Sequence, residues 1–202
     1  MLDFIELLSG KGVEIQHIDF GGGLGIRYHN ETPPSPADYW SILHKQLRSR
    51  NISIPITIEP GRAIVGNAGV LLTEVNFLKS TESTHFCIVD AGMNDLIRPA
   101  LYGAYQEIVQ VNQKSDATEM SYNVVGPICE SGDFLGKSRT LSVRSGDLLA
   151  VRSAGAYGAV MASNYNARPR PAEVMVDDDQ IHLIRQRETL KKLYEGESIL
   201  PS

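Results

Sequence analysis

The sequence has 202 residues, of which 42% are hydrophobic, and its formal net charge at pH 7 is −5. A chain of this length and composition can bury a hydrophobic core in one or two domains, so we expect a folded protein. The negative charge and the absence of any block rich in lysine and arginine argue against a nucleic-acid partner, whose phosphates require a basic surface. A small molecule or another protein is the expected partner.

No run of the sequence approaches the roughly 18 apolar residues of a membrane span, and no basic segment follows Met1 as in a signal peptide. We therefore expect no membrane partner and a cytoplasmic protein. The two cysteines belong neither to a CxxC pair nor to a cluster with histidine, which predicts no disulfide scaffold and no metal site. Cys87 stands in an apolar run and is expected to be an inert core residue, whereas Cys129 lies in a turn-rich stretch that can expose its thiol.

The first quarter of the chain alternates between helix and strand patterns. Residues 2–9 have helical apolar spacing, and residues 13–20 alternate like a strand before a group of glycines. A second helix is expected from Ser35 as N-cap to about residue 50, because Pro36 suits the first helical position. Residues 54–59 then form a β-branched run, short enough for a buried strand. This alternation is typical of parallel α/β sheets and barrels.

From about Val70 onward the pattern becomes that of an all-β domain, in which strand-like runs are separated by turn residues. The junction is expected at the stretch from Gly66 to Gly69, and only residues 188–195 again suggest a helix. The strand-like runs are residues 70–78, 85–90, 106–111, 148–152 and 173–176. The fold class predicted from the sequence is therefore α/β followed by all-β.

A glycine cluster, Gly21, Gly22 and Gly23 with a further glycine at position 25, follows the first expected strand in the run HIDFGGGLG. Glycines at the end of a parallel strand let backbone N–H groups hold a phosphate, because no Cβ stands in the way. The spacing is not GxGxxG and no helix follows directly, so a dinucleotide-binding loop is not indicated. The residues alone leave a phosphate cradle and a plain turn open.

The motif EPGR, which contains Glu59, Gly61 and Arg62, ends the second expected strand just as the glycines end the first. In a βα-barrel both motifs would face the same mouth, where active sites are built. A capped turn with a surface ion pair is the alternative. Against that alternative, we expect Glu59 to be partly buried, which is costly for a carboxylate unless it meets a cation such as a protonated pyridine nitrogen.

Three segments of the second part contain further candidate residues. Arg98 and Tyr102 in DAGMNDLIRPALY could converge on one ligand, since arginine holds carboxylates in a bidentate fork, although Arg98 could equally be a surface residue. Cys129 and Glu130 in GPICESGD set a thiol beside a carboxylate. Tyr157 in SAGAYG offers a hydroxyl among small residues, which suits a phosphate or a tight turn.

Taken in order, HIDFGGGLG, EPGR, DAGMNDLIRPALY, GPICESGDFL, SAGAYG and SNYNARPRPAEV resemble the C-terminal half of the diaminopimelate decarboxylases. These are fold type III, alanine-racemase-like enzymes that depend on pyridoxal 5'-phosphate (PLP). The resemblance implies that residues 1–68 are the last βα units of a PLP-binding, TIM-like barrel. It also implies that residues 69–202 are a C-terminal β-domain with a short final helix.

The resemblance also implies roles for the candidate residues. Gly21, Gly22, Gly23, Gly61, Arg62 and Tyr157 would bind the cofactor, and Glu59 would face its pyridine nitrogen as a catalytic residue. Arg62, Arg98, Tyr102, Glu130 and Tyr157 would bind meso-diaminopimelate, whose far end carries its own ammonium and carboxylate. Cys129 would be the acid that protonates the product, acting in the partner's site of a homodimer with shared active sites.

One part of the family pattern has no counterpart here. The family's cofactor-binding lysine lies in a YAxKAN-like motif on the first barrel strand, and no lysine of this sequence has such a context, whether Lys11, Lys45, Lys79, Lys114, Lys137, Lys191 or Lys192. We therefore expect the C-terminal half of a decarboxylase that converts meso-2,6-diaminopimelate to L-lysine and CO₂, inactive alone. The alternative is a non-catalytic truncated paralogue that acts as a dimerisation or regulatory module.

Overall fold

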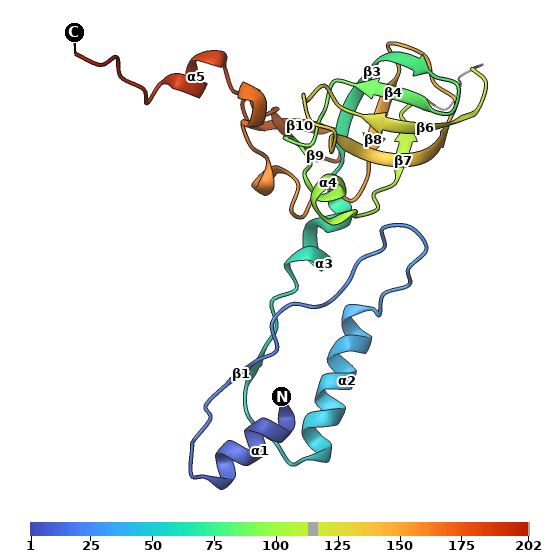
Figure 1. Ribbon diagram of the computed structural model, residues 1–202. Coiled ribbons are helices and arrows are strands. Elements are labelled where there is room, and N and C mark those ends of the chain that lie inside the picture. Colours follow the sequence, from blue (N-terminus) through green and yellow to red (C-terminus); the bar gives the residue numbers. More distant parts are fainter. Residues whose placement is uncertain (113–116, 202) are drawn as a thin grey trace.

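The computed structural model describes residues 1–112 and 117–201, so Lys114 and the last residue of the second expected domain lie outside the described residues. Figure 1 shows an elongated arm, residues 1–65, that ends against a compact body of β-strands. A two-stranded hairpin and a short helix follow the body toward the C-terminus. No helix of the described residues is long and apolar enough to cross a membrane.

In the arm, helices α1 and α2 lie beside two short parallel strands, and these two helices follow the sequence signals closely. Helix α1 spans Leu2–Gly10 and helix α2 spans Pro36–Ser49. The backbone N–H of Asp38 donates to the hydroxyl of Ser35 at 3.1 Å, and the Asp38 carboxylate accepts the Ser35 N–H in return. This reciprocal capping fixes the start of α2 where the sequence predicts it.

The two strands of the arm are much shorter than the sequence suggests. Strand β1 (Ile18–Asp19) pairs in parallel with β2 (Ile56–Thr57), and each strand has two residues in place of the expected eight and six. Backbone hydrogen bonds continue past the strands, since the N–H of Phe20 donates to the carbonyl of Thr57 and that of Glu59 to the carbonyl of Gly21, but no third strand lies beside the pair among the described residues. A small core holds β1 to the helices and contains Ile5, Ile18 and Leu47.

The body is a six-stranded, nearly closed sheet with the strand order β5-β8-β3-β4-β6-β7. Within it β4 and β6 pair in parallel, and the other neighbours are antiparallel. Alternate residues of the strands point inward and form the main core, which includes Val75, Cys87, Val124, Leu135 and Leu149. The strands are β3 (Leu71–Ser80), β4 (His85–Val89), β5 (Ile108–Gln110), β6 (Met120–Val125), β7 (Phe134–Leu141) and β8 (Leu148–Val151).

Short elements connect and extend the body. Helix α3 (Gly61–Val65) and the 3₁₀ helix η1 (Gly66–Ala68) lead into β3, and α4 (Arg98–Tyr102) follows β4. Two 3₁₀ turns, η2 (Ala159–Met161) and η3 (Tyr165–Ala167), precede the hairpin of β9 (Glu173–Asp177) and β10 (Gln180–Arg185). Helix α5 (Leu190–Tyr194) falls within the helix expected near the C-terminus, and the apolar side chains of the hairpin are exposed.

Close backbone packing joins the arm to the body. The N–H of Ala154 donates to the carbonyl of Gly69 at 2.9 Å, and the N–H of Gly155 donates to the carbonyl of Gly66 at 3.1 Å. A Cβ on Gly155 would overlap the carbonyl oxygen of Val65, so only glycine permits this approach. The contact places the loop after β8, which carries Tyr157, beside α3.

Candidate active site

The glycine loop after β1 lies directly against the end of β2, as the parallel pairing requires. Gly21 and Gly23 have φ values of 68° and 85°, in the left-handed region that favours glycine. A Cβ on Gly22 would stand 2.8 Å from the carbonyl oxygen of Glu59, so this position also has no room for a side chain. The expectation that the two motifs share one mouth is confirmed.

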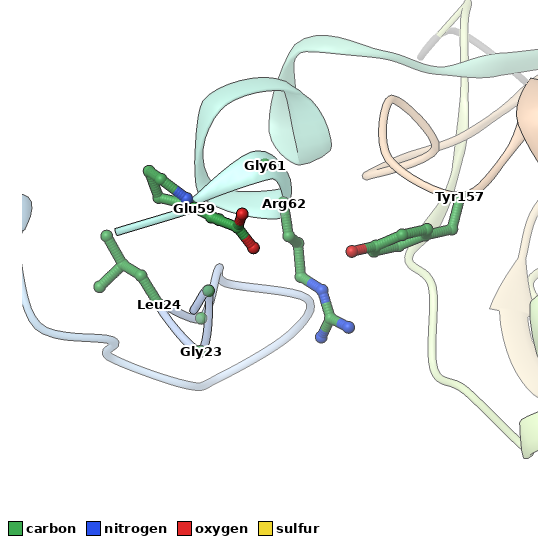
Figure 2. Close-up of a pocket in the computed structure, with 9 residues that line it drawn as sticks. Gly23, Leu24, Glu59, Gly61, Arg62 and Tyr157 are labelled. Atoms are coloured by element: carbon green, nitrogen blue, oxygen red, sulfur yellow. The ribbon is translucent and has the colours of Figure 1, made fainter. Parts of the chain in front are cut away.

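A cavity of about 140 Å³ opens at this mouth. Figure 2 shows Arg62 between Glu59 and the ring of Tyr157, with the tyrosine hydroxyl directed toward the arginine. The lining residues are Gly22, Gly23, Leu24, Gly25, Glu59, Pro60, Gly61, Arg62 and Tyr157. The cavity is therefore lined by Glu59 and by five of the residues predicted to bind the cofactor. Gly21 is not among the lining residues but directly precedes Gly22, which is.

The position of Glu59 differs from the prediction in one respect, because its side chain is exposed and not partly buried. The strand that precedes it is short, and β1 is its only neighbour in the sheet among the described residues, so nothing there covers the carboxylate. The prediction assumed a strand enclosed on both sides. The carboxylate nevertheless points toward the cavity (Figure 2).

A stack of aromatic rings and guanidinium groups extends from the cavity to helix α4. The guanidinium carbon of Arg62 lies 5.4 Å from the ring centroid of Tyr157, and that of Arg98 lies 5.4 Å from the same centroid. Arg98 also lies 5.3 Å from the ring of Tyr102, which belongs to the same helix. The Nε of Arg98 is buried and has no hydrogen-bond partner among the described residues. An arginine held on aromatic faces retains donors that can bind an anion.

Cys129 and Glu130 lie on the loop between β6 and β7 and do not line this cavity. Both are exposed, and the hydroxyl of Tyr165 lies 3.4 Å from a carboxylate oxygen of Glu130. Cys87, by contrast, is fully buried in the body, and burial raises the pKa of its thiol to about 12. The predicted division between an inert and an accessible cysteine is therefore confirmed.

Two buried carboxylates and a half-buried arginine near these loops were not identified in the sequence analysis. Asp133 accepts backbone N–H groups from Met93 and Ile128, and Asp95 accepts the N–H of Gly92. Burial raises the pKa of both carboxyl groups. Arg168 donates to the carbonyl of Asp90 at 2.7 Å and to the side chain of Asn94 at 3.2 Å. Each of these charged residues stands among turn-forming residues, where no apolar periodicity distinguishes one position from the next. Only their contacts in the structure show that they hold these loops together.

The residues of the cavity fit the phosphate and the pyridine ring of a PLP-like cofactor. The glycine loop provides backbone space for a phosphate, and Arg62 and the Tyr157 hydroxyl supply a cation and a hydrogen-bond donor. Glu59 supplies a carboxylate within the same opening. Such a set can hold an anionic group at one end and a protonated ring nitrogen at the other.

Comparisons with known proteins point in the same direction. The family described as pyridoxal-dependent decarboxylase, C-terminal sheet domain, matches residues 13–155. The diaminopimelate decarboxylase of Pseudomonas aeruginosa is 56% identical over 201 residues, which are 100% of this chain and 48% of that relative. The chain therefore spans about half the length of the curated relatives it matches.

Solved structures show the same similarity in three dimensions. The diaminopimelate decarboxylase of M. jannaschii in complex with L-lysine has a TM-score of 0.91 at 38% identity, with 99% of this chain and 46% of that chain covered. The enzyme from Helicobacter pylori, also complexed with L-lysine, has a TM-score of 0.87 at 37% identity, with 96% and 48% covered.

Proposed function

The chain belongs to the pyridoxal-dependent decarboxylase family, and on this premise we propose that it forms the C-terminal half of a diaminopimelate decarboxylase. The complete enzyme would convert meso-2,6-diaminopimelate to L-lysine and CO₂, a step of lysine biosynthesis. The observation that carries this proposal is the convergence of the glycine loop, Glu59, Arg62 and Tyr157 on one cavity. In this proposal residues 1–68 contribute to the PLP-binding barrel and residues 69–202 form the β-domain.

The cofactor would be held by residues of the cavity. Gly21, Gly22, Gly23 and Gly61 would surround the phosphate of pyridoxal 5'-phosphate, with the N–H groups of Gly22 and Gly23, the cation of Arg62 and the hydroxyl of Tyr157 as its donors. The N–H groups of Gly21 and Gly61 already donate to Asp19 Oδ1 and to the carbonyl of Glu59. Glu59 would keep a proton on the pyridine nitrogen. When bound, the cofactor supplies an electron sink for the electron pair left behind when CO₂ departs.

The substrate would be held at its far end, away from the carboxylate that leaves. Arg98, stacked on Tyr102 and Tyr157, has an unpaired buried Nε that suits the distal carboxylate, and Arg62 lies across the same tyrosine ring. Glu130 would accept the distal ammonium group. The two arginines would thus face the distal carboxylate and Glu130 the distal ammonium group. This arrangement would select a substrate that carries a second amino-acid group.

Cys129 would act in a homodimer with shared active sites. It is exposed, outside the cavity of its own chain, and its thiol would give a proton to the carbon that has lost CO₂ in the partner's site. Both cysteines are free, which suits a reducing compartment, and we place the enzyme in the cytoplasm.

The test joins this chain to the remaining half of the Pseudomonas aeruginosa relative and measures CO₂ release from meso-diaminopimelate. We call this fusion the complete enzyme. It should release CO₂ and bind pyridoxal phosphate, whereas the isolated chain should do neither, because the lining residues of the described cavity include no lysine to hold the cofactor covalently.

Two outcomes contradict the proposal. The first is a folded, cofactor-bound fusion that releases no CO₂ under conditions in which the relative's own enzyme does. The second is CO₂ release by the isolated chain, which would show that the described half is sufficient. Circular dichroism of the fusion separates a failure of folding from a failure of chemistry, and a misfolded fusion is replaced by co-expression of the two halves.

A further inference from the structure

Asp133 is a buried carboxylate that connects two loops of the body. Asp133 directly precedes β7, and the residue is 4% exposed. One oxygen accepts the backbone N–H of Met93 at 2.6 Å, and the other accepts the backbone N–H of Ile128 at 2.7 Å. The donors belong to different segments, so a single side chain fixes the distance between them.

The space around this carboxylate is shaped to receive it. A Cβ on Gly126 would stand 2.5 Å from one of its oxygens, and a Cβ on Gly92 would stand 3.3 Å from the other. The N–H of Gly126 also donates to the carbonyl oxygen of Asp133 at 3.2 Å. Both segments therefore lie against Asp133 along their backbones, which leaves the carboxylate little freedom to take another position.

Each segment leads into residues of the proposed substrate site. Ile128 directly precedes Cys129 and Glu130. Met93 lies in the turn before α4, which begins at Arg98, and Asp95 stiffens this turn by accepting the N–H of Gly92 at 2.9 Å. A displacement at Met93 would therefore be transmitted to α4.

We propose that Asp133 is a positioning residue that holds both the Arg98 segment and the Cys129–Glu130 loop in place. This inference rests on the proposed function, in which the Arg98 segment binds substrate in the site of its own chain and the Cys129–Glu130 loop reaches the partner's site. Asp133 touches neither substrate nor cofactor. It acts through the backbones of Met93 and Ile128, so its loss should change substrate affinity while the cofactor stays bound.

The experiment compares Asp133→Ala and Asp133→Asn in the complete enzyme. Alanine removes both acceptors, whereas asparagine keeps one oxygen and turns an NH₂ donor toward the second backbone N–H. We expect kcat/KM for diaminopimelate to fall by about 10- to 100-fold in Asp133→Ala, mainly through KM, because small displacements of binding groups have effects of this size. Asp133→Asn should lie between Asp133→Ala and the unaltered enzyme.

A matched control separates positioning from general destabilisation. Asp147 accepts the backbone N–H of Arg144 at 2.8 Å in the turn between β7 and β8, so Asp147→Ala also removes a side-chain acceptor of a backbone N–H. It should leave KM within about twofold of the unaltered value, because it reaches neither loop of the proposed site. Cofactor absorbance should be retained in all three variants.

Amide hydrogen exchange gives a readout that does not depend on activity. In Asp133→Ala, exchange should accelerate in residues 90–98 and 126–133 together, whereas Asp147→Ala should accelerate it only around its own turn. An unchanged KM in Asp133→Ala, an equal rise in Asp147→Ala, or faster exchange in only one of the two segments would overturn the inference. If the unaltered enzyme released no CO₂, the proposed function would fail, and the exchange pattern would still decide whether Asp133 holds the loops together.

Discussion

The guanidinium carbon of Arg98 lies 5.4 Å from the ring centroid of Tyr157, although strands β5 to β8 separate the two residues along the chain. Arg62, from the end of the arm, lies at the same distance from that ring. The ring of Tyr157 thus connects a proposed phosphate ligand with a proposed substrate ligand. Its backbone is held at a φ of 59°, an uncommon conformation for a residue with a side chain.

Tyr157→Leu in the complete enzyme should weaken substrate binding by removing the aromatic face beside both arginines. Each cation–π interaction at an exposed ring contributes about 0.5 to 1 kcal/mol, so the two together contribute about 1 to 2 kcal/mol and KM for diaminopimelate should rise about 5- to 30-fold. Tyr157→Phe keeps the ring and removes the hydroxyl, and it should weaken the affinity for pyridoxal phosphate more than it raises KM. Equal effects of the two variants on KM and on cofactor affinity would contradict this division of roles.

Glu59→Gln should lower kcat far more than it weakens cofactor retention. The carboxylate acts on charge that develops during CO₂ departure, and the loss of such an interaction costs about 100-fold or more. Turnover and cofactor content are measured together in the complete enzyme. If the variant loses pyridoxal phosphate yet turns over normally after reconstitution, the assigned role of Glu59 is wrong.

Gly155→Ala should destabilise the connection between arm and body. The added methyl group would overlap the carbonyl oxygen of Val65 and stand 2.8 Å from the backbone nitrogen of Gly69, with backbone on both sides. We expect a loss of about 1 to 3 kcal/mol in the free energy of unfolding, measured by denaturant titration of the complete enzyme. Gly196→Ala is the control, since its Cβ would have no neighbour within 4 Å. Equal stability of the two variants would argue against the tight junction.

Glu188 should make the stability of the segment before α5 depend on pH. Its carboxylate accepts from Arg170 Nη2 at 2.5 Å and from Asn164 Nδ2 at 2.7 Å, and these donors, Arg170 first, lower its pKa from 4.5 to about 2. A depressed pKa means that the stabilisation is fully present above the unfolded-state pKa and is lost as the pH falls from about 4.5 to about 2.

The free energy of unfolding is measured against pH for the complete enzyme and for Glu188→Gln. The difference between the two should be largest near neutral pH and should shrink over that acidic range. A difference that stays constant from neutral pH down to about pH 2 would show that the Glu188 carboxylate gains nothing from its partners in the folded state.

Cys129 should complement a defect in the partner subunit. One complete enzyme is made with Cys129→Ala and another with its cofactor-binding lysine changed to alanine, and each homodimer should be nearly inactive. Mixing gives about half heterodimers, each with one intact site, so activity should recover to roughly a quarter of the unaltered level if subunits exchange freely. No recovery in a mixture whose heterodimers are confirmed by native mass spectrometry would place Cys129 in its own subunit's site.

The sequence predicted helices α1 and α2 of the arm and most strands of the body, because capping and apolar periodicity are local signals. The side chains of Ser35 and Asp38 form the cap of α2 and Pro36 occupies its first position, so these residues determine where the helix begins. Strands β6, β7 and β10 and helices α3 and α4 are not among the expected elements. Strand β6 alternates between apolar and polar side chains, with Ser121 and Asn123 at the polar positions, so its strand pattern was overlooked, whereas α4 is a five-residue helix with a proline near its start.

The site was predictable as a set of motifs but not as a geometry. That Gly22 and Glu59 lie at the same end of the sheet could be inferred from two parallel strands. The stacking of the arginines on Tyr157, in contrast, depends on the close approach of Gly155 to Val65. The exposure of Glu59 was missed because burial depends on neighbouring strands and not on the apolar residues that precede it. Asp133 was missed because its partners are backbone groups, which leave no mark in a sequence.

The parallel ladder of the arm joins only two residue pairs, Ile18 with Ile56 and Asp19 with Thr57, across the whole of α2. So short a ladder closes a long loop with few hydrogen bonds, whereas the body has a continuous core and antiparallel neighbours. Heating the isolated chain should therefore release the glycine loop first and melt the body later, in two transitions. The glycine loop that we propose to bind the phosphate would then lose its order before the body does, and its stability would depend on the strands that would lie beside β1 and β2 in the complete barrel.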